Sequence, residues 1–157
     1  MNLPSHSVHE IWKFFVQGHS KYANTRIPPH FYFCDNEQDA NICAELVVKN
    51  IKQATATSVW WYKHHNQSMP KVGDLFIVTD WNGTAKAIIE ITKIELVRFK
   101  DVTEAFAQAE GEGDKSLNFW RKVHQEYYSR EMEKAGEYFN ENMLISCEYF
   151  KTVFKAE

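Results

Sequence analysis

The segment Lys86–Leu96, KAIIEITKIEL, changes the phase of its apolar residues partway along its length. Side chains of a β-strand point alternately to the two faces of a sheet, so a regular strand keeps its apolar residues two positions apart. Here the alternation holds at first and then slips: Ala87, Ile89 and Ile91, then Ile94 and Leu96. Such a slip predicts a bulge or a sharp bend near Thr92 and Lys93. Small barrels turn corners at bends of this kind, so the segment favours a small β-barrel.

Three further segments have the composition of strands. Thr55–Tyr62, TATSVWWY, is β-branched and aromatic, and Asp74–Thr79, DLFIVT, leads into a hairpin turn at Trp81-Asn82-Gly83. Leu144–Phe154, LISCEYFKTVF, is the last expected strand. Because strand side chains alternate, one ring of Trp60-Trp61-Tyr62 should face outward or into a cavity.

Helix signals surround these strands. Three starts are predicted by a capping residue followed three positions later by Glu or Gln, at Ser7 and Glu10, Asp35 and Gln38, and Asp101 and Glu104. A long helix is expected over residues 115–139, and a loop over 19–29. The predicted fold class is α+β, a small, mostly antiparallel β-barrel surrounded by helices. It forms a single domain over 1–157, in which 1–29 are an N-terminal helix and loop and 30–155 are the core.

Charge and cysteine content narrow the function classes. The 157 residues carry a net charge of −3 with a pI near 6.2, which argues against a protein that grips duplex DNA or an anionic membrane through its overall field. A local basic pocket is still compatible. Cys34, Cys43 and Cys147 form no CxxC pair, so we expect three buried, reduced thiols. No membrane span or signal peptide is recognisable, and a cytoplasmic location is expected.

Lys52 and Thr55 lie where the second expected helix gives way to a Thr-rich extended segment, NIKQATAT. Such a junction brings side chains of both elements to one place. A lysine three residues before a threonine could activate the hydroxyl if burial removed the proton of its ammonium group. A structural reading is equally simple, because lysine suits a helix C-terminus and threonine suits strands.

The stretch Ala109–Asp114, AEGEGD, interleaves acids with glycines just before the long helix. It lacks the alternating ligands of a calcium loop. One reading is a solvated turn in which Asp114 caps the helix. The other is a cleft wall in which Glu110 points into a cavity and the glycines allow close approach of a ligand, with Glu112 and Asp114 beside it.

On the long helix, Trp120 and His124 share one side, where packing roles are expected for both, and His124 is in addition a candidate ligand-binding residue. Arg121 stands next to the acidic stretch. Its guanidinium either pairs with an acid there, Glu110, Glu112 or Asp114, or binds a phosphate. His64 and His65 have no partners at ligand spacing, so no metal site is predicted.

Taken together, these segments resemble the ASCH domain family, a relative of the PUA RNA-binding barrel. The resemblance covers residues 30–155 and is most specific in EGEGDKSLNFWRKVH, which matches E-G-E-G-D-x-S-L-x-x-W-R-x-x-H in a longer bacterial subgroup. It implies a β-barrel with a central cleft. Of the ASCH pattern G-x-K-x-x-E-x-R only Lys52 is kept, because Asn50, Thr55 and Thr57 occupy the other positions.

A bacterial branch of that family hydrolyses acetylated cytidine with a K-x-x-T motif and a distant Glu. Lys52 and Thr55 match the spacing, and Glu110 follows the helix after which that Glu would lie. The resemblance thus implies a hydrolase acting on an amide of a modified pyrimidine nucleoside. Thr55 would be the nucleophile, Lys52 the base or oxyanion stabiliser, and Glu110 an orienting group.

A non-catalytic RNA-binding module is the alternative, using Lys52, Arg121 and an aromatic ring such as Trp60 or Trp61. Another branch of the family resembles ribonucleases, and a cleft without activity is the third possibility. The expected partner is RNA or a small nucleoside-like ligand, with no cofactor.

Overall fold

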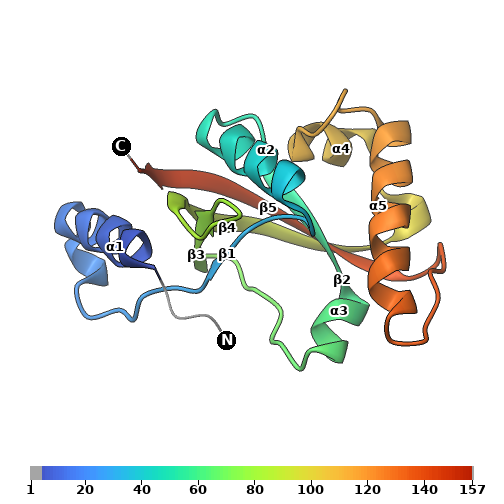
Figure 1. The fold of residues 1–157 in the computed structure, drawn as a ribbon, viewed down its shortest axis with the longest axis horizontal. Coiled ribbons are helices and arrows are strands. Elements are labelled where there is room, and N and C mark those ends of the chain that lie inside the picture. Colours follow the sequence, from blue (N-terminus) through green and yellow to red (C-terminus); the bar gives the residue numbers. More distant parts are fainter. Residues whose placement is uncertain (1–4, 157) are drawn as a thin grey trace.

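The computed structural model describes residues 5–156, which form one sheet and the helices around it (Figure 1). The strands are β1 (His30–Phe31), β2 (Ala54–Ser58), β3 (Leu75–Thr79), β4 (Ala85–Arg98) and β5 (Leu144–Lys155). The α-helices are α1 (His6–Gly18), α2 (Glu37–Val48), α3 (Val59–His64), α4 (Glu104–Glu110) and α5 (Leu117–Glu133). Two 3₁₀ turns, η1 (Ser20–Tyr22) and η2 (Phe99–Asp101), complete the set. The predicted α+β class is confirmed.

The sheet has the strand order β1-β3-β4-β5-β2, in which only β1 and β3 are parallel. The two long strands β4 and β5 pair along most of their length, and their register shifts between Ile91 and Lys93. The predicted bulge is therefore confirmed. Within residues 5–156 the short strands β1 and β2 are the two edges and do not pair, so hydrogen bonds do not close the barrel.

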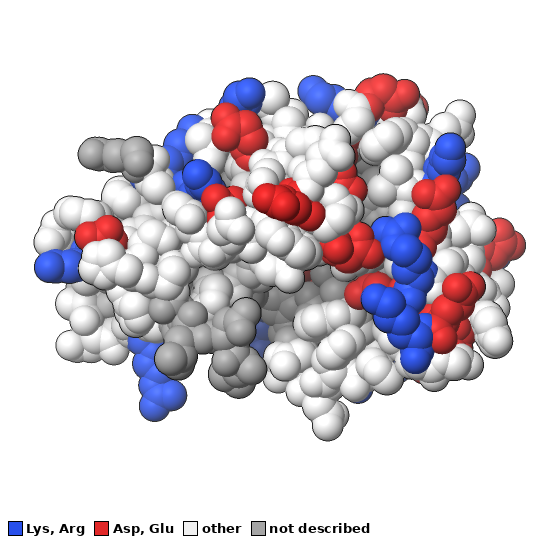
Figure 2. All heavy atoms as spheres, viewed as in Figure 1, with Lys and Arg blue, Asp and Glu red and all other residues white. Residues whose placement is uncertain are grey.

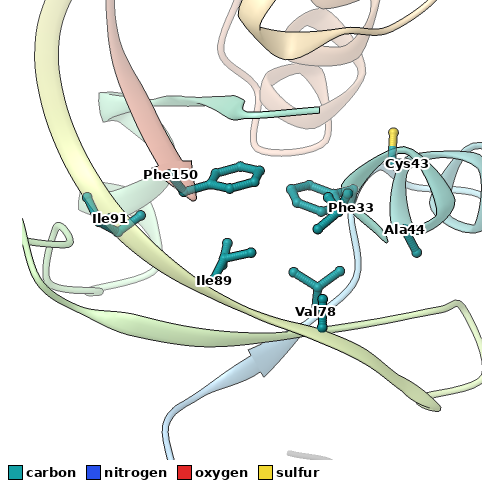
Figure 3. Close-up of a cluster of buried hydrophobic side chains, with 9 residues drawn as sticks. Phe33, Cys43, Ala44, Val78, Ile89, Ile91 and Phe150 are labelled. Atoms are coloured by element: carbon teal, nitrogen blue, oxygen red, sulfur yellow. The ribbon is translucent and has the colours of Figure 1, made fainter. Parts of the chain in front are cut away.

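The first half of β4, from Ala85 to Ile91, packs against the core on both faces, whereas the second half is largely exposed or half-buried. Ile89 and Ile91 pack with Phe33 and Phe150 under helix α2, in the cluster of Figure 3. Ile88, on the opposite face, packs against helix α1. A third cluster lies under α4 and α5, where Trp120 and Tyr128 meet the far ends of β4 and β5. The cleft described below opens between these layers.

The predicted strand Thr55–Tyr62 is wrong in its second half. The strand ends at Ser58, whose hydroxyl accepts a hydrogen bond from the backbone N–H of Trp61 and so caps helix α3. The aromatic triplet therefore lies on a helix, and its expected alternation between two sheet faces does not occur. A serine three residues before Trp61 was the local signal for this helix.

Four other helix starts differ by one or two residues from the prediction, because a neighbouring polar side chain provides the cap. The caps are Ser5, Asn36, Thr103 and Ser116, in place of Ser7, Asp35, Asp101 and Asp114. Helix α5 also ends at Glu133, well before residue 139. Among the described residues, no helix has both the length and the apolar character that crossing a bilayer demands.

Candidate functional site

A cleft of about 980 Å³ opens between β2, the segment around β1, α3 and α5. On the face in Figure 2 the surface is hollowed near the centre, and charged side chains gather along α5. The lining of the cleft includes seven carboxylates, Asp35, Asp39, Asp74, Glu110, Glu112, Glu131 and Glu148. Only two Lys or Arg side chains, Lys52 and Arg130, line it. The cleft is therefore acidic, apart from one buried cation.

Lys52 is that cation, and the end of helix α2 explains its position. Asn50 adopts the left-handed conformation with φ +60°, and the N–H groups of Ile51 and Lys52 both donate to the carbonyl of Leu46. The chain thereby turns back, and the Lys52 side chain enters the interior, where the residue is 2% exposed. Burial of this kind requires partners for the charge.

The Lys52 ammonium has those partners. Nζ donates to the carbonyl of Ala54 and to Oε2 of Glu112, each at 2.9 Å, and lies 4.9 Å from the centre of the Phe33 ring. Burial by itself lowers the pKa of Lys52, but the negative charges of Glu110 and Glu112 outweigh it and raise the pKa. Lys52 is therefore charged at neutral pH.

Glu112 is held from two sides. Oε2 accepts from Lys52, and Oε1 accepts from the Cys43 thiol at 3.3 Å. Burial would raise the pKa of Glu112, yet the Lys52 ammonium and further contacts lower it to about 2. The carboxylate that contacts the lysine directly is thus Glu112, whereas Glu110 acts on Lys52 through its charge. The sequence analysis had predicted that Glu110 would be the orienting group, but the acid in contact with Lys52 is Glu112.

Glu110 ends helix α4 and is 1% exposed. Its Oε2 lies 3.2 Å from Nε2 of His124. The other ring nitrogen of His124, Nδ1, lies 2.8 Å from the carbonyl of Trp120, which can only accept, so Nδ1 carries a proton. Burial lowers the pKa of His124, but the charge of Glu110 raises it overall. Lys52, Glu110, Glu112 and His124 thus form a largely buried set in which two acids face one lysine and one histidine.

Gly111 makes the approach of the two segments possible. It follows Glu110 with φ +71°, and a Cβ at this position would lie 2.5 Å from the carbonyl oxygen of Ile51. The N–H of Gln53 donates to the carbonyl of Ala109 at 2.7 Å and fastens the same two segments. The acid-glycine stretch therefore contributes to the cleft wall, which is the second of the two interpretations of this stretch given above.

Thr55 lies on strand β2 opposite Glu148 of strand β5, and both line the cleft. Opposed residues of an antiparallel pair point to the same face. Glu148 is buried and accepts a hydrogen bond from the Tyr62 hydroxyl at 2.7 Å. Burial raises the pKa of Glu148. Sequence reasoning missed Glu148 and Tyr62, although an acid inside the apolar strand LISCEYF was a usable signal.

Three predicted site residues lie elsewhere, away from the cleft lining. The Trp60 indole donates to Glu137 and stacks on His64. Asp114 accepts from the N–H of Ser116 within its own turn. Arg121 is exposed and donates only to the carbonyl of Lys100 at 3.4 Å, so the predicted pairing with Glu110, Glu112 or Asp114 is absent among the described residues.

The remaining predicted aromatic, Trp61, does line the cleft, and its ring stacks on His65. His64 and His65 stack on different tryptophans, Trp60 and Trp61. Two other groups bring ligand atoms within 4.8 Å of one another, Cys34 with Cys43 and Glu112, and Glu110 with Glu112 and His124. Both include Glu112, which is already neutralised by Lys52.

At the mouth of the cleft, Arg130 of α5 binds Asp35 through two hydrogen bonds of 3.0 and 3.3 Å. This bridge joins the loop before α2 to helix α5. Nearby Glu131 has its pKa raised to about 7 by burial. The cleft therefore has one ion pair at its base and another at its entrance.

Comparison with known proteins identifies the fold and the family. The ASCH domain model matches residues 30–154. A crystal structure of an ASCH domain from Lactobacillus crispatus JV V101 is 35% identical, with 96% of each chain covered and a TM-score of 0.89. A protein from Enterococcus faecalis V583 is 31% identical over 95% of this chain and 89% of its own, with a TM-score of 0.87. No curated protein matches. The fold is accordingly the RNA-binding-like, PUA-like one, and the chain belongs to the ASCH domain family.

Proposed function

We propose that this protein hydrolyses the amide of a modified pyrimidine nucleoside, with Thr55 as nucleophile and Lys52 as the cation that stabilises the oxyanion. The observation that carries the proposal is a cleft that Lys52 and Thr55, neighbours in sequence, share with the remote Glu110. The raised pKa of Lys52 supports the role of oxyanion stabiliser, because a lysine that holds its proton is a poor general base.

The proton of Thr55 then needs another acceptor. Glu148 faces the same side of the sheet from the adjacent strand position, and its raised pKa makes it a better base than an exposed carboxylate. In this scheme the Thr55 hydroxyl attacks the amide carbonyl as its proton passes to Glu148. The tetrahedral oxyanion is stabilised by Lys52, the amine leaves with a proton from Glu148, and water hydrolyses the acyl-threonine ester.

The charge of the cleft supports an uncharged ligand. Seven carboxylates against two Lys or Arg side chains would repel a chain of phosphates, whereas a nucleoside carries none. Aromatic rings such as Trp61 and Tyr127 line the same cleft and offer apolar faces to a base.

The test measures release of cytidine from N4-acylated cytidines by chromatography. Thr55→Ala should lower the turnover rate at least about 10³-fold, while Thr55→Ser, which keeps the hydroxyl, should retain a measurable rate. Glu148→Gln should lower the rate by about 10²- to 10⁴-fold, as expected for loss of a general base.

Two outcomes would contradict the proposal. One is a Thr55→Ala protein that turns over as fast as the wild type. The other is a wild-type protein that releases no cytidine but binds single-stranded RNA in a salt-sensitive way, which would favour the binding module instead. Arg121→Ala serves as the matched control in the hydrolysis assay, because Arg121 lies outside the cleft lining.

A further inference from the structure

Two cysteine sulfurs lie close together in the wall of the cleft. Sγ of Cys34, in the loop before α2, is 3.8 Å from Sγ of Cys43 on α2. Cys34 is half-buried and lines the cleft, whereas Cys43 is 2% exposed. Cys34 has φ +66°, a left-handed conformation that non-glycine residues rarely adopt. The loop takes this strained form where its thiol meets Cys43.

The thiols are joined to the buried ion pair by a chain of hydrogen bonds. Cys43 donates its only hydrogen to Oε1 of Glu112 at 3.3 Å, so the contact between the two sulfurs uses the hydrogen of Cys34. Glu112 in turn accepts from Lys52. Cys43 and Lys52 therefore share Glu112 as a hydrogen-bond partner, so a chemical change at the Cys43 thiol alters the environment of Lys52.

We propose that Cys34 and Cys43 are a redox-active pair that forms a reversible disulfide when a peroxide or a small disulfide enters the cleft. Cys34 reacts first because it lines the cleft. With a peroxide, its thiolate attacks one oxygen and becomes a sulfenic acid, and Cys43 then displaces hydroxide from that sulfur. Two thiols and one hydrogen peroxide give one disulfide and two waters.

The environment of Cys43 suits the second step. The hydrogen bond with Cys34 and burial raise its pKa, so the thiol is slow to react with oxidants from solution. A sulfur that is adjacent to a sulfenic acid reacts at high effective concentration in spite of this. Cys147, the third free cysteine, is buried in the cluster under α4 and α5 and takes part in neither step.

Disulfide formation alters the cleft in two ways. It removes the S–H that Cys43 donates to Glu112, and it draws the sulfurs from 3.8 Å to about 2.05 Å. The moving loop carries Phe33, whose ring contacts Lys52, and Asp35, which is bound to Arg130. Oxidation should therefore slow the reaction proposed above, and a reducing thiol should restore it.

The chemical test uses intact-mass spectrometry on the folded protein with Cys147→Ala. Hydrogen peroxide or oxidised glutathione should remove the mass of two hydrogen atoms from each chain, and dithiothreitol should return it. In the Cys43→Ala protein, oxidised glutathione should leave a stable adduct at Cys34, because no second thiol resolves it. In the Cys34→Ala protein, Cys43 should remain largely unmodified.

A glutathione adduct or oxygen additions alone in the protein that keeps both cysteines would overturn the proposal. That protein carries the decisive measurement, so misfolding of either single variant does not affect it. The effect on turnover rests on the proposed function, whereas the mass measurement does not. A disulfide that forms without slowing hydrolysis would refute the link to Lys52 and leave the redox pair established.

Discussion

The two ion pairs of the cleft have similar N–O distances, 2.9 and 3.0 Å, but their exposure to water differs widely. Lys52 and Glu112 at the base have side chains that are 2% and 19% exposed, whereas Arg130 and Asp35 at the entrance are 50% and 33% exposed. A charge in the interior interacts strongly with its partner and is expensive to leave alone, while water screens the pair at the entrance. The comparison teaches that burial, and not the hydrogen-bond distance, decides which pair controls stability and reactivity.

The largest effect should come from breaking the buried pair. Lys52→Met leaves the carboxylates of Glu110 and Glu112 without their lysine, which should lower the free energy of unfolding by about 3–5 kcal/mol. Chemical denaturation monitored by circular dichroism measures it. The double variant Lys52→Met with Glu112→Gln is the control and should recover part of the loss. A loss below about 1 kcal/mol in Lys52→Met would place this pair in the same class as the exposed one.

The pH dependence should follow the buried pair. The pKa of Glu112 falls from 4.5 to about 2 on folding, so its contribution of about 3 kcal/mol is present above pH 4.5 and is lost as the pH falls toward 2. His124 has a raised pKa, so its contribution is present below its unfolded pKa and is lost as the pH rises through the folded pKa.

The free energy of unfolding, measured by denaturation at a series of pH values, separates these two contributions. Glu112→Gln should weaken the pH dependence between about pH 4.5 and pH 2, and His124→Gln should weaken it above the unfolded pKa of histidine. An equally steep pH dependence in the acidic range without Glu112 would show that other carboxylates produce it.

Two glycines with similar backbone conformations also differ in how crowded their surroundings are. Gly111 at the cleft and Gly136 after α5 have φ of +71° and +76°, but only Gly111 faces a neighbouring carbonyl, and Gly136 has open space around it. Gly136→Ala should cost about 1 kcal/mol, from strain in the left-handed region. Gly111→Ala should cost about 1–3 kcal/mol more, because Ile51 must move. Equal thermal stability of the two variants would contradict this.

The smallest effect should come from the entrance pair. Asp35→Asn should change the free energy of unfolding by about 0–1 kcal/mol, and the difference should shrink in high salt. Denaturation at two salt concentrations measures it. A salt-independent loss comparable to that of Lys52→Met would mean that the bridge is effectively buried.

Much of the fold could be predicted because its signals are local. The phase slip in Lys86–Leu96 predicted the bulge that the β4–β5 register shows, and the long final strand was found with nearly its observed bounds. The strand predicted through Tyr62 failed because one serine cap outweighs the β-propensity of three aromatic residues.

The candidate site was predictable only in part. Lys52, Thr55, Glu110, Glu112 and His124 do line one cleft. Asp114 and Arg121, from the same motif, do not, because proximity in sequence says little about which side of a turn or helix a side chain takes. Glu148 and Cys34 were missed as cleft residues, since their position depends on partners more than sixty residues away or on an unusual loop conformation.

By itself, the sequence determined most of the elements, the family and the residue types available for chemistry, since periodicity, caps and motifs are encoded over a few neighbouring positions. Only the tertiary structure decided which acid holds Lys52, that its charge survives burial, and that two thiols meet beside it. These properties arise from desolvation and from distances of a few ångströms between remote segments, and no local pattern specifies either.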